Sequence, residues 1–319
     1  MMEWALSGLG LVILLLAGDS LVKGAVNLSL RVGIPALIVS LTIVAFGTSA
    51  PELLISINAV LMNKPGLALG NVVGSNTANI LLVMGIPAII TVLHTSQCNT
   101  RKTYVFMILS SVLFIGLALY GEFNFISGLI LLAGLALVLA DALRDASLHR
   151  RAMNALPLVD LEDVEGADPD MSWVLILLFL TLGLIGLPLG ADLLVDNASI
   201  IARRYGVSDS VIGLTLVAVG TSLPELATSV MAALRKQADV ALGNVIGSNM
   251  FNLLAIIGVT ALIGRIPVDP EFLRFDLWVM LGASLLLIPF VFMGRDMGRG
   301  WGIGFVVAYV VYATVVLVY

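Results

Sequence analysis

The sequence predicts an all-α polytopic membrane protein whose ten transmembrane helices form two inverted five-helix repeats. Of its 319 residues, 60% are hydrophobic and 12% are charged, whereas a soluble domain carries about 25% charged residues. Too few polar side chains remain to cover a water-soluble globule. Within lipid the backbone must satisfy its own hydrogen bonds, and a helix does so inside one segment. A match between the two halves of the chain, described below, predicts the repeats.

Ten apolar runs are long enough to be transmembrane helices, each of which needs about 20 mostly apolar residues. They cover residues 2–22, 34–61, 66–93, 103–120, 124–142, 173–196, 206–234, 238–264, 273–293 and 300–318. No small-residue cleavage site follows the first run. We therefore expect it to be a retained helix and not a signal peptide.

The composition excludes several classes of function. A net charge of −5, with 16 Lys and Arg against 21 Asp and Glu, provides no basic field for nucleic acid. Cys98 is the only cysteine, and His94 and His149 are the only histidines, so neither a disulfide nor a His/Cys metal cluster is expected. The sequence contains no GxGD, HExxH or DDxxD motif. We therefore expect no enzyme and no cofactor.

The basic residues set the expected orientation. With the amino terminus outside, eleven of the sixteen Lys and Arg residues fall in inner loops and five in outer loops, as the positive-inside rule requires. Both termini are then outside. The chain divides into a first five-helix repeat at 1–142, a cytoplasmic linker at 143–172 and a second five-helix repeat at 173–319. Acidic residues gather in the later part of this linker. We expect a solvated linker between the two halves, and a regulatory cation site is the alternative.

An internal repeat relates the two halves. Residues 31–85 align without a gap to residues 204–258, with 26 identities in 55 positions at an offset of 173. Each half contains five predicted spans, and because five is odd the second half enters the membrane from the opposite side. Such inverted repeats are typical of secondary transporters, whose sites lie near the midplane between the repeats. An old duplication without a transport role is the alternative.

Two glutamates lie inside predicted spans at matching positions of the repeat, Glu52 and Glu225. A charge at the bilayer centre costs about 2.5–3.5 kcal/mol even on permissive insertion scales. The nearby spans offer no Lys or Arg at the same depth. We therefore expect a bound cation as the partner of these carboxylates, or a proton when the site is empty.

A proline precedes each glutamate, Pro51 and Pro224. Because proline has no N–H, the carbonyl four residues earlier loses its helical partner. Carbonyls freed at membrane depth are tolerated where they line a polar cavity, and there they make hard oxygen ligands. A simple kink is the alternative, but the adjacent glutamate in both copies favours ligands.

Further oxygens recur at helical spacing. Thr48, Glu52 and Ser56 are four residues apart and share a helix face, as do their counterparts in the second half. The next span carries a second stripe with the same spacing. Its members are Asn71, Ser75 and Asn79, matched by Asn244, Ser248 and Asn252. Interhelical hydrogen bonding is the alternative for part of each stripe, above all for Asn71, Asn76, Asn244 and Asn249. Carboxylates, carbonyls, hydroxyls and amides together suit a hard cation such as calcium.

These motifs carry a specific resemblance. Each half contains GTS-x-PE followed by GN-V-(V/I)-GSN, and these segments resemble the alpha repeats of the cation/calcium antiporter superfamily. Within it the chain is most similar to the prokaryotic sodium/calcium exchangers. The resemblance implies a multi-pass protein of the prokaryotic cell membrane that exchanges sodium for calcium by alternating access. No protein partner is expected beyond the lipid bilayer and the transported ions.

The resemblance also implies a set of ion ligands. Calcium would be bound by Glu52, Glu225, Thr48 and Thr221. Sodium sites would be built around it from Ala45, Ala218, Ser49, Ser222, Ser75 and Ser248. Asn79 and Asn252 match the polar positions at the centre. Some relatives have Asp at the position of Asn252, a feature associated with potassium-dependent exchangers, so Asn favours exchange without potassium.

The family implies three sodium ions per calcium ion, which would make the exchange electrogenic. Protons would compete for the same carboxylates. Two antiporters on the same fold remain as alternatives, a calcium/proton antiporter and a potassium-dependent sodium/calcium exchanger. A channel with the same ligands is a further alternative, although two converging carboxylates in an inverted repeat favour occlusion.

Overall fold

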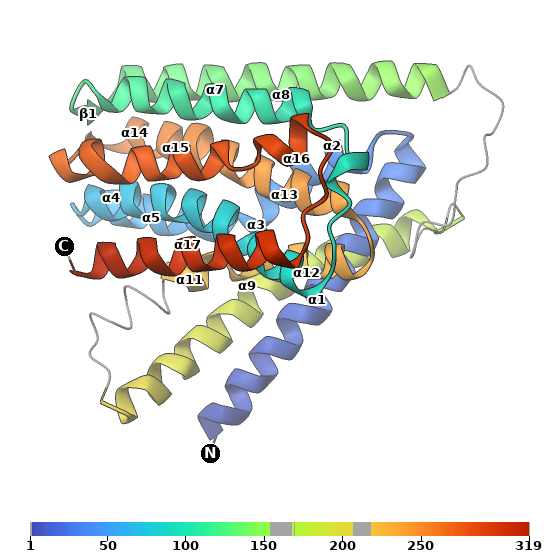
Figure 1. The fold of residues 1–319 in the computed structure, drawn as a ribbon, viewed down its shortest axis with the longest axis horizontal. Coiled ribbons are helices and arrows are strands. Elements are labelled where there is room, and N and C mark those ends of the chain that lie inside the picture. The colour runs from blue at the N-terminus through green and yellow to red at the C-terminus, as the bar shows by residue number, and fades with distance from the viewer. Residues whose placement is uncertain (1, 154–167, 169, 207–217, 319) are drawn as a thin grey trace.

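The computed structural model describes residues 2–153, 168, 170–206 and 218–318, and it is a bundle of helices (Figure 1). The first half contains α1 (Met2–Val32), α2 (Ala36–Val39), α3 (Ala45–Thr48), α4 (Ala50–Leu61), α5 (Pro65–Ala78), α6 (Gly85–Ile90), α7 (Arg101–Ala118) and α8 (Phe125–Met153). Two π-helical turns, η1 (Ser40–Val44) and η2 (Asn79–Val83), and the 3₁₀ turn η3 (Thr95–Gln97) lie between them.

The second half is also mainly helical in its described residues. It contains α9 (Trp173–Arg204), α11 (Ala218–Thr221), α12 (Leu223–Leu234), α13 (Ala238–Met250), α14 (Ile257–Ile263), α15 (Leu277–Leu285), α16 (Ile288–Phe292) and α17 (Arg299–Val318). Its π-helical turns are η5 (Phe251–Ile256) and η6 (Phe272–Asp276). The strands β1 (Glu122–Phe123) and β2 (Ile266–Pro267) form the one small sheet of the described residues.

Eight described helices are long and apolar enough to cross a membrane, or nine if the bent pair 36–48 and 50–61 is one span. The protein is therefore a multi-pass membrane protein. The predicted span at 206–234 falls partly outside the described residues, so the count of ten stays a prediction. Three helices end later than predicted, and one of them is α9, which extends to Arg204 and not to 196. The first extends to Val32 and not to 22, and α8 extends to Met153 and not to 142.

The extension of α8 has a local cause. Residues 143–153 contain no Gly or Pro, and Ala, Leu and Arg in this segment favour a helix. Asp145, in the first turn of this segment, forms an ion pair with Lys102 at the start of α7, with an N–O distance of 2.7 Å. The predicted linker therefore begins as helix, and its residues 154–167 and 169 lie outside the described residues.

Both spans that carry the GTS-x-PE motif break at its serine. Ser49 lies between α3 and α4, which are bent by 43°, and Ser222 lies between α11 and α12. Their backbone angles are nearly the same, φ −86° and ψ 4° at Ser49 and φ −90° and ψ 4° at Ser222. The Ala45 carbonyl, which lies one turn before the first break, accepts the Ser49 N–H at 3.0 Å and lies 3.3 Å from the Thr48 hydroxyl.

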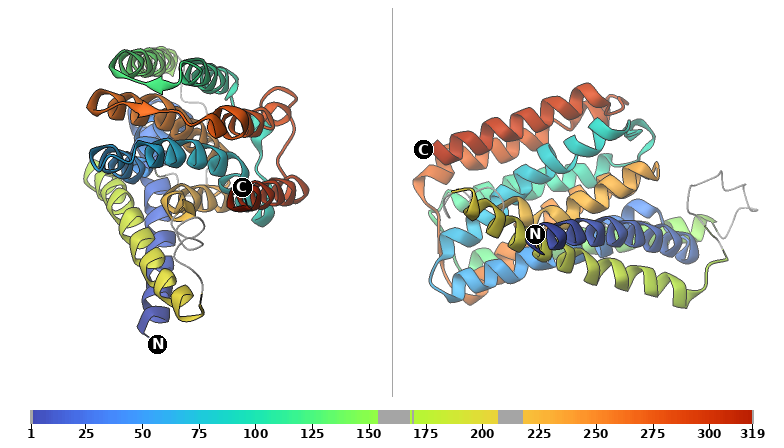
Figure 2. Two further views of the ribbon diagram at one scale, coloured as in Figure 1. Left: turned by 90° about the vertical axis from the view of Figure 1, so that its left-hand side faces the viewer. Right: turned by 90° about the horizontal axis from the view of Figure 1, so that it is seen from below.

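The long helices α1 and α9 pack against each other and lie obliquely to the remaining bundle (Figure 1). Glycines permit this close approach. A Cβ atom on Gly183 would lie 2.5 Å from the Leu21 Cβ atom, and one on Gly190 would lie 2.8 Å from the Leu14 nitrogen. The two further views show the pair on one side of the bundle (Figure 2).

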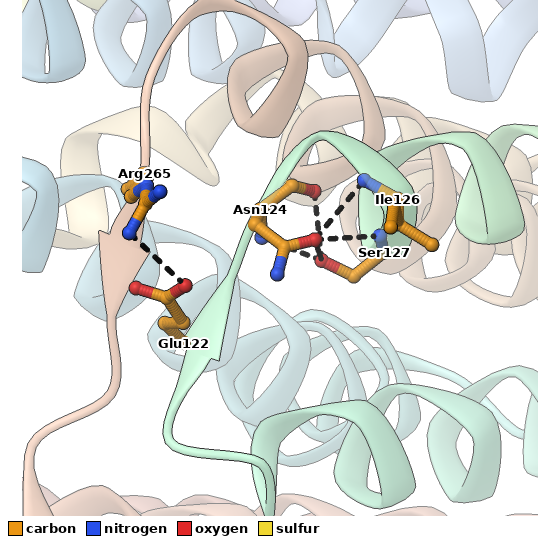
Figure 3. A network of polar contacts seen from close by, with 5 residues as sticks. All are labelled: Glu122, Asn124, Ile126, Ser127 and Arg265. Carbon is orange, nitrogen blue, oxygen red and sulfur yellow. Dashed lines mark hydrogen bonds and ion pairs between the residues drawn. The ribbon is translucent and has the colours of Figure 1, made fainter.

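Short backbone ladders join the two halves at both ends of the bundle. At one end Phe123 pairs with Ile266, with the Glu122–Arg265 ion pair beside it at 3.6 Å (Figure 3). At the other end Leu93 pairs with Met297. Each ladder joins the connection after the third span of one half to the connection before the fifth span of the other. This reciprocity is the pattern expected of an inverted repeat.

Candidate ion-binding site

Glu52 and Glu225 lie in the first turns of α4 and α12, directly after the two helix breaks. Their exposed fractions are 1% and 0%. Ser49, three residues before Glu52, donates its hydroxyl to Oε1 of Glu225 at 3.1 Å, so the segments that carry the two glutamates meet. The structure thus brings together, in one buried place, the two acidic residues that the sequence pairs through the repeat.

The helix breaks also affect the electrostatics of these glutamates. A break begins a new helix at Ala50 and another at Leu223, and the N–H groups of a first turn have no helical acceptors. The amino-terminal end of a helix carries a partial positive charge that stabilises nearby anions. A carboxylate in each first turn is therefore stabilised in part without a Lys or Arg partner.

The hydrogen bonds of the two glutamates differ. Oε1 of Glu225 accepts the Ser49 hydroxyl at 3.1 Å and the Ser248 hydroxyl at 3.5 Å. Oε2 of Glu225 and both carboxylate oxygens of Glu52 are buried and have no partner among the described residues. Buried polar atoms in folded proteins are nearly always paired. These three oxygens are therefore suited to a bound cation or to a proton.

The predicted threonine and alanine ligands lie at the same breaks. Thr48 and Thr221 are the last residues of α3 and α11, so their carbonyls are at helix ends. Thr48 is buried and Thr221 half-buried. Ala45 is fully buried, with an exposed fraction of 0%, and Ala218 begins α11.

The four predicted serines are all buried, but only two of them contact a glutamate among the described bonds. Ser49 and Ser248 bond to Glu225, as given above. The hydroxyl of Ser222, the counterpart of Ser49, has no partner among the described residues. Ser75, the counterpart of Ser248, is 3% exposed.

The two predicted asparagines lie within the first two residues of π-helical turns. Asn79 is the first residue of η2, and Asn252 is the second residue of η5. Nδ2 of Asn79 donates to Oδ1 of Asn249 at 3.1 Å, while Oδ1 of Asn79 and both amide atoms of Asn252 lack a partner in the described structure. A π turn places one extra residue in the helix and leaves local groups free, and such turns are frequent at functional sites.

Asn76 and Asn249, which the repeat relates to each other, meet directly. Nδ2 of Asn76 donates to the Asn249 carbonyl at 3.2 Å, and Nδ2 of Asn249 donates to the Asn76 carbonyl at 3.4 Å. The sequence-based expectation of interhelical hydrogen bonding at these positions is confirmed. The sequence did not predict the bond from Ser49 to Glu225 across the halves, although the repeat offers a signal for such contacts.

The described residues contain no group of three or more His, Cys, Asp or Glu side chains placed to hold a metal ion. The candidate site is of another kind. Its donors are two carboxylates combined with hydroxyls, amides and carbonyls at helix ends. This is the donor set that hard cations such as calcium and sodium prefer.

A comparison with protein families identifies the chain. The family model described as "Sodium/calcium exchanger protein" matches residues 2–142 and 175–318. The chain belongs to this family. The sodium/calcium exchanger MaX1 of Methanosarcina acetivorans is 33% identical to it, covering 96% of each chain. The putative antiporter CaxA of Alkalimonas amylolytica is 36% identical over 279 residues, which are 88% of this chain and 86% of that one.

The fold of this family member is also that of a solved exchanger. The sodium-calcium exchanger NCX_Mj, soaked with sodium and strontium, superimposes with a TM-score of 0.82 at 32% identity, covering 98% of each chain. This similarity extends over both halves of the bundle.

Proposed function

We propose that the protein is a secondary active antiporter that exchanges sodium for calcium across the membrane by alternating access. The observation that carries this proposal is the pair of buried glutamates, one from each half, with three carboxylate oxygens left without a protein partner. Membership of the sodium/calcium exchanger family and the match to NCX_Mj support the choice of ions.

The proposed ligands follow from the breaks and from the family. Glu52 and Glu225 hold calcium together with the carbonyls of Thr48 and Thr221. Sodium ions are held by the surrounding alanine carbonyls and serine hydroxyls. The members of this second set are Ala45, Ala218, Ser49, Ser222, Ser75 and Ser248, with Asn79 and Asn252 at the centre.

Charge balance explains the coupling. Two ionised glutamates give the site a charge of −2, which one calcium ion or two sodium ions would neutralise. With three sodium ions per calcium ion, the sodium-loaded state carries one more positive charge, so exchange is electrogenic. An empty site would leave two desolvated carboxylates, and this opposes the conformational change without ions. We also propose that the termini lie outside a prokaryotic cell membrane.

The test is calcium-45 uptake into proteoliposomes under sodium, potassium and proton gradients imposed one at a time. We expect uptake to require internal sodium and to continue when potassium is removed. An inside-positive potential should accelerate it, because each cycle would move one net positive charge outward. Uptake driven by a pH gradient alone, with no effect of sodium, would show a calcium/proton antiporter and overturn the proposal.

A further inference from the structure

An asparagine on a neighbouring helix bonds to the segment that carries each glutamate. In the first half, Nδ2 of Asn71 on α5 lies 3.3 Å from the carbonyl oxygen of Glu52 and 3.1 Å from Oγ of Ser56. Ser56 follows Glu52 by one helical turn, so one amide group holds two successive turns of α4.

The second half repeats this arrangement at the matching positions. Nδ2 of Asn244 on α13 lies 3.4 Å from the carbonyl oxygen of Glu225 and 3.5 Å from Oγ of Ser229. Asn244 is fully buried, with an exposed fraction of 0%. We call each set of one amide, one glutamate carbonyl and one serine hydroxyl an amide clamp.

The chemistry of the clamp explains the residue type. A carbonyl at position i and a hydroxyl at i+4 lie side by side on a helix, and a primary amide supplies two N–H groups to reach both. An ionised Asp has no donor, and Leu has the same shape as Asn but no polar atom. Neither could hold both acceptors.

The second clamp also reaches the opposite half. Oγ1 of Thr48 lies 3.3 Å from Oδ1 of Asn244 and 3.3 Å from the Ala45 carbonyl oxygen, so its one proton is shared between these two acceptors. The two ends of the Asn244 amide thus contact α12 and α3. Asn244 therefore ties the turn that carries Glu225 to the helix end that carries the Thr48 carbonyl. The breaks make such ties necessary, because each glutamate lies in a first turn that a continuous helix no longer supports.

We propose that Asn71 and Asn244 are positioning residues that fix the two glutamates at the separation the calcium ion requires. This inference rests on the proposed function, since it assigns the residues that shape that site. Neither asparagine belongs to the proposed ligand set. Each acts through the backbone of its glutamate, and Asn244 also acts through Thr48.

The first experiment replaces each amide by its apolar counterpart, Asn71→Leu and Asn244→Leu, in the full chain reconstituted in proteoliposomes. We expect the half-saturating calcium concentration to rise about tenfold, while the maximal rate of exchange stays within about threefold of the wild type. The variants Asn71→Gln and Asn244→Gln keep both donors on a longer stem and should recover part of the affinity. The control is Thr260→Val, because Thr260 is buried and its hydroxyl donates only within its own helix, to Ile256 and Ile257.

A double-mutant cycle tests the link between the halves. Thr48→Val keeps the Thr48 backbone carbonyl and removes the hydroxyl. Because that hydroxyl donates to Asn244, the effects of Thr48→Val and Asn244→Leu on calcium affinity should not be additive. The effects of Thr48→Val and Asn71→Leu should add.

Thermal unfolding in detergent separates positioning from a merely structural role. If the asparagines position the glutamates, calcium raises the melting temperature of both Leu variants by less than it raises that of the wild type. Without ions, the melting temperature of these variants then falls no further than that of Thr260→Val. A lower ion-free melting temperature with unchanged calcium affinity would overturn the inference. If the wild type itself shows no sodium-dependent calcium uptake, the proposed function fails, and calcium-induced stabilisation of the variants still tests the clamp.

Discussion

At the scale of single residues, the two copies of one motif make different contacts. Ser49 and Ser222 occupy the same place in GTS-x-PE, yet Ser49 donates to Glu225 at 3.1 Å and Ser222 has no described partner. Hydrogen bonds to charged groups contribute about 1.5–3 kcal/mol. Ser49 therefore fixes the orientation of the Glu225 carboxylate in this structure.

We predict that Ser49→Ala raises the calcium concentration needed for half-maximal thermal stabilisation by about tenfold, since about 1.4 kcal/mol is a factor of ten. Ser222→Ala is the matched control and should give a smaller change, because its hydroxyl bonds to none of the described residues. Equal effects of the two substitutions would show that the contact from Ser49 does not orient the carboxylate.

At the scale of elements, the contact between α1 and α9 depends on the absence of side chains. A Cβ atom at Gly183 would lie 2.5 Å from the Leu21 Cβ atom, so Gly183→Ala forces the helices apart. Overpacking of this kind typically costs about 1–3 kcal/mol. We predict a lower apparent melting temperature for this variant in detergent.

Gly8 on α1 provides the control, since a Cβ atom there would have no neighbour within 4 Å. Replacing glycine by alanine inside a helix is favourable by about 0.5–1 kcal/mol. Gly8→Ala should therefore preserve or raise the melting temperature. A Gly183→Ala protein as stable as Gly8→Ala would contradict the close packing of α1 on α9.

The loop ladder around Leu93 and Met297 contains a titratable contact outside the membrane spans. Asp296 accepts the Ser96 N–H at 3.0 Å and lies 3.0 Å from the ring of His94. Hydrogen bonds from Ser96, and then from His94, lower the pKa of Asp296 below its ordinary value of 3.8. The charged carboxylate is thus favoured in the folded protein.

A lowered pKa stabilises the fold fully above the unfolded value, and this contribution is lost as the pH falls through the folded value. We therefore predict that the melting temperature of the wild type falls more steeply below about pH 4 than that of Asp296→Asn. Parallel curves of melting temperature against pH would show that this contact does not hold the two loops together.

At the scale of the whole molecule, the sequence predicts the eight or nine apolar helices that the described residues form, and it pairs the two glutamates. Apolar runs locate the helices because lipid leaves the backbone no other hydrogen-bonding partners. The repeat pairs Glu52 with Glu225 because equivalent positions meet near the axis that the predicted inverted repeat implies. Asn76 and Asn249, which exchange hydrogen bonds, show the same relation.

Other features could not be predicted from the sequence. Hydropathy does not mark where a helix leaves the lipid, and so the predicted ends of α1, α8 and α9 lie about eight to eleven residues too early. Identical motifs cannot reveal which serine bonds to which glutamate, because that asymmetry arises from the arrangement of the halves. The break at Ser49 comes four residues after Ala45, so the Ser49 N–H still bonds to the Ala45 carbonyl.

The most direct test of the shared carboxylate site is sodium-dependent calcium-45 uptake by Glu52→Gln and Glu225→Gln in proteoliposomes. Each substitution keeps the shape of the side chain and removes one negative charge from the site. We predict that either one abolishes exchange, while Thr260→Val retains it. Near-normal uptake by both glutamine variants would contradict the claim that the two halves hold one ion between them.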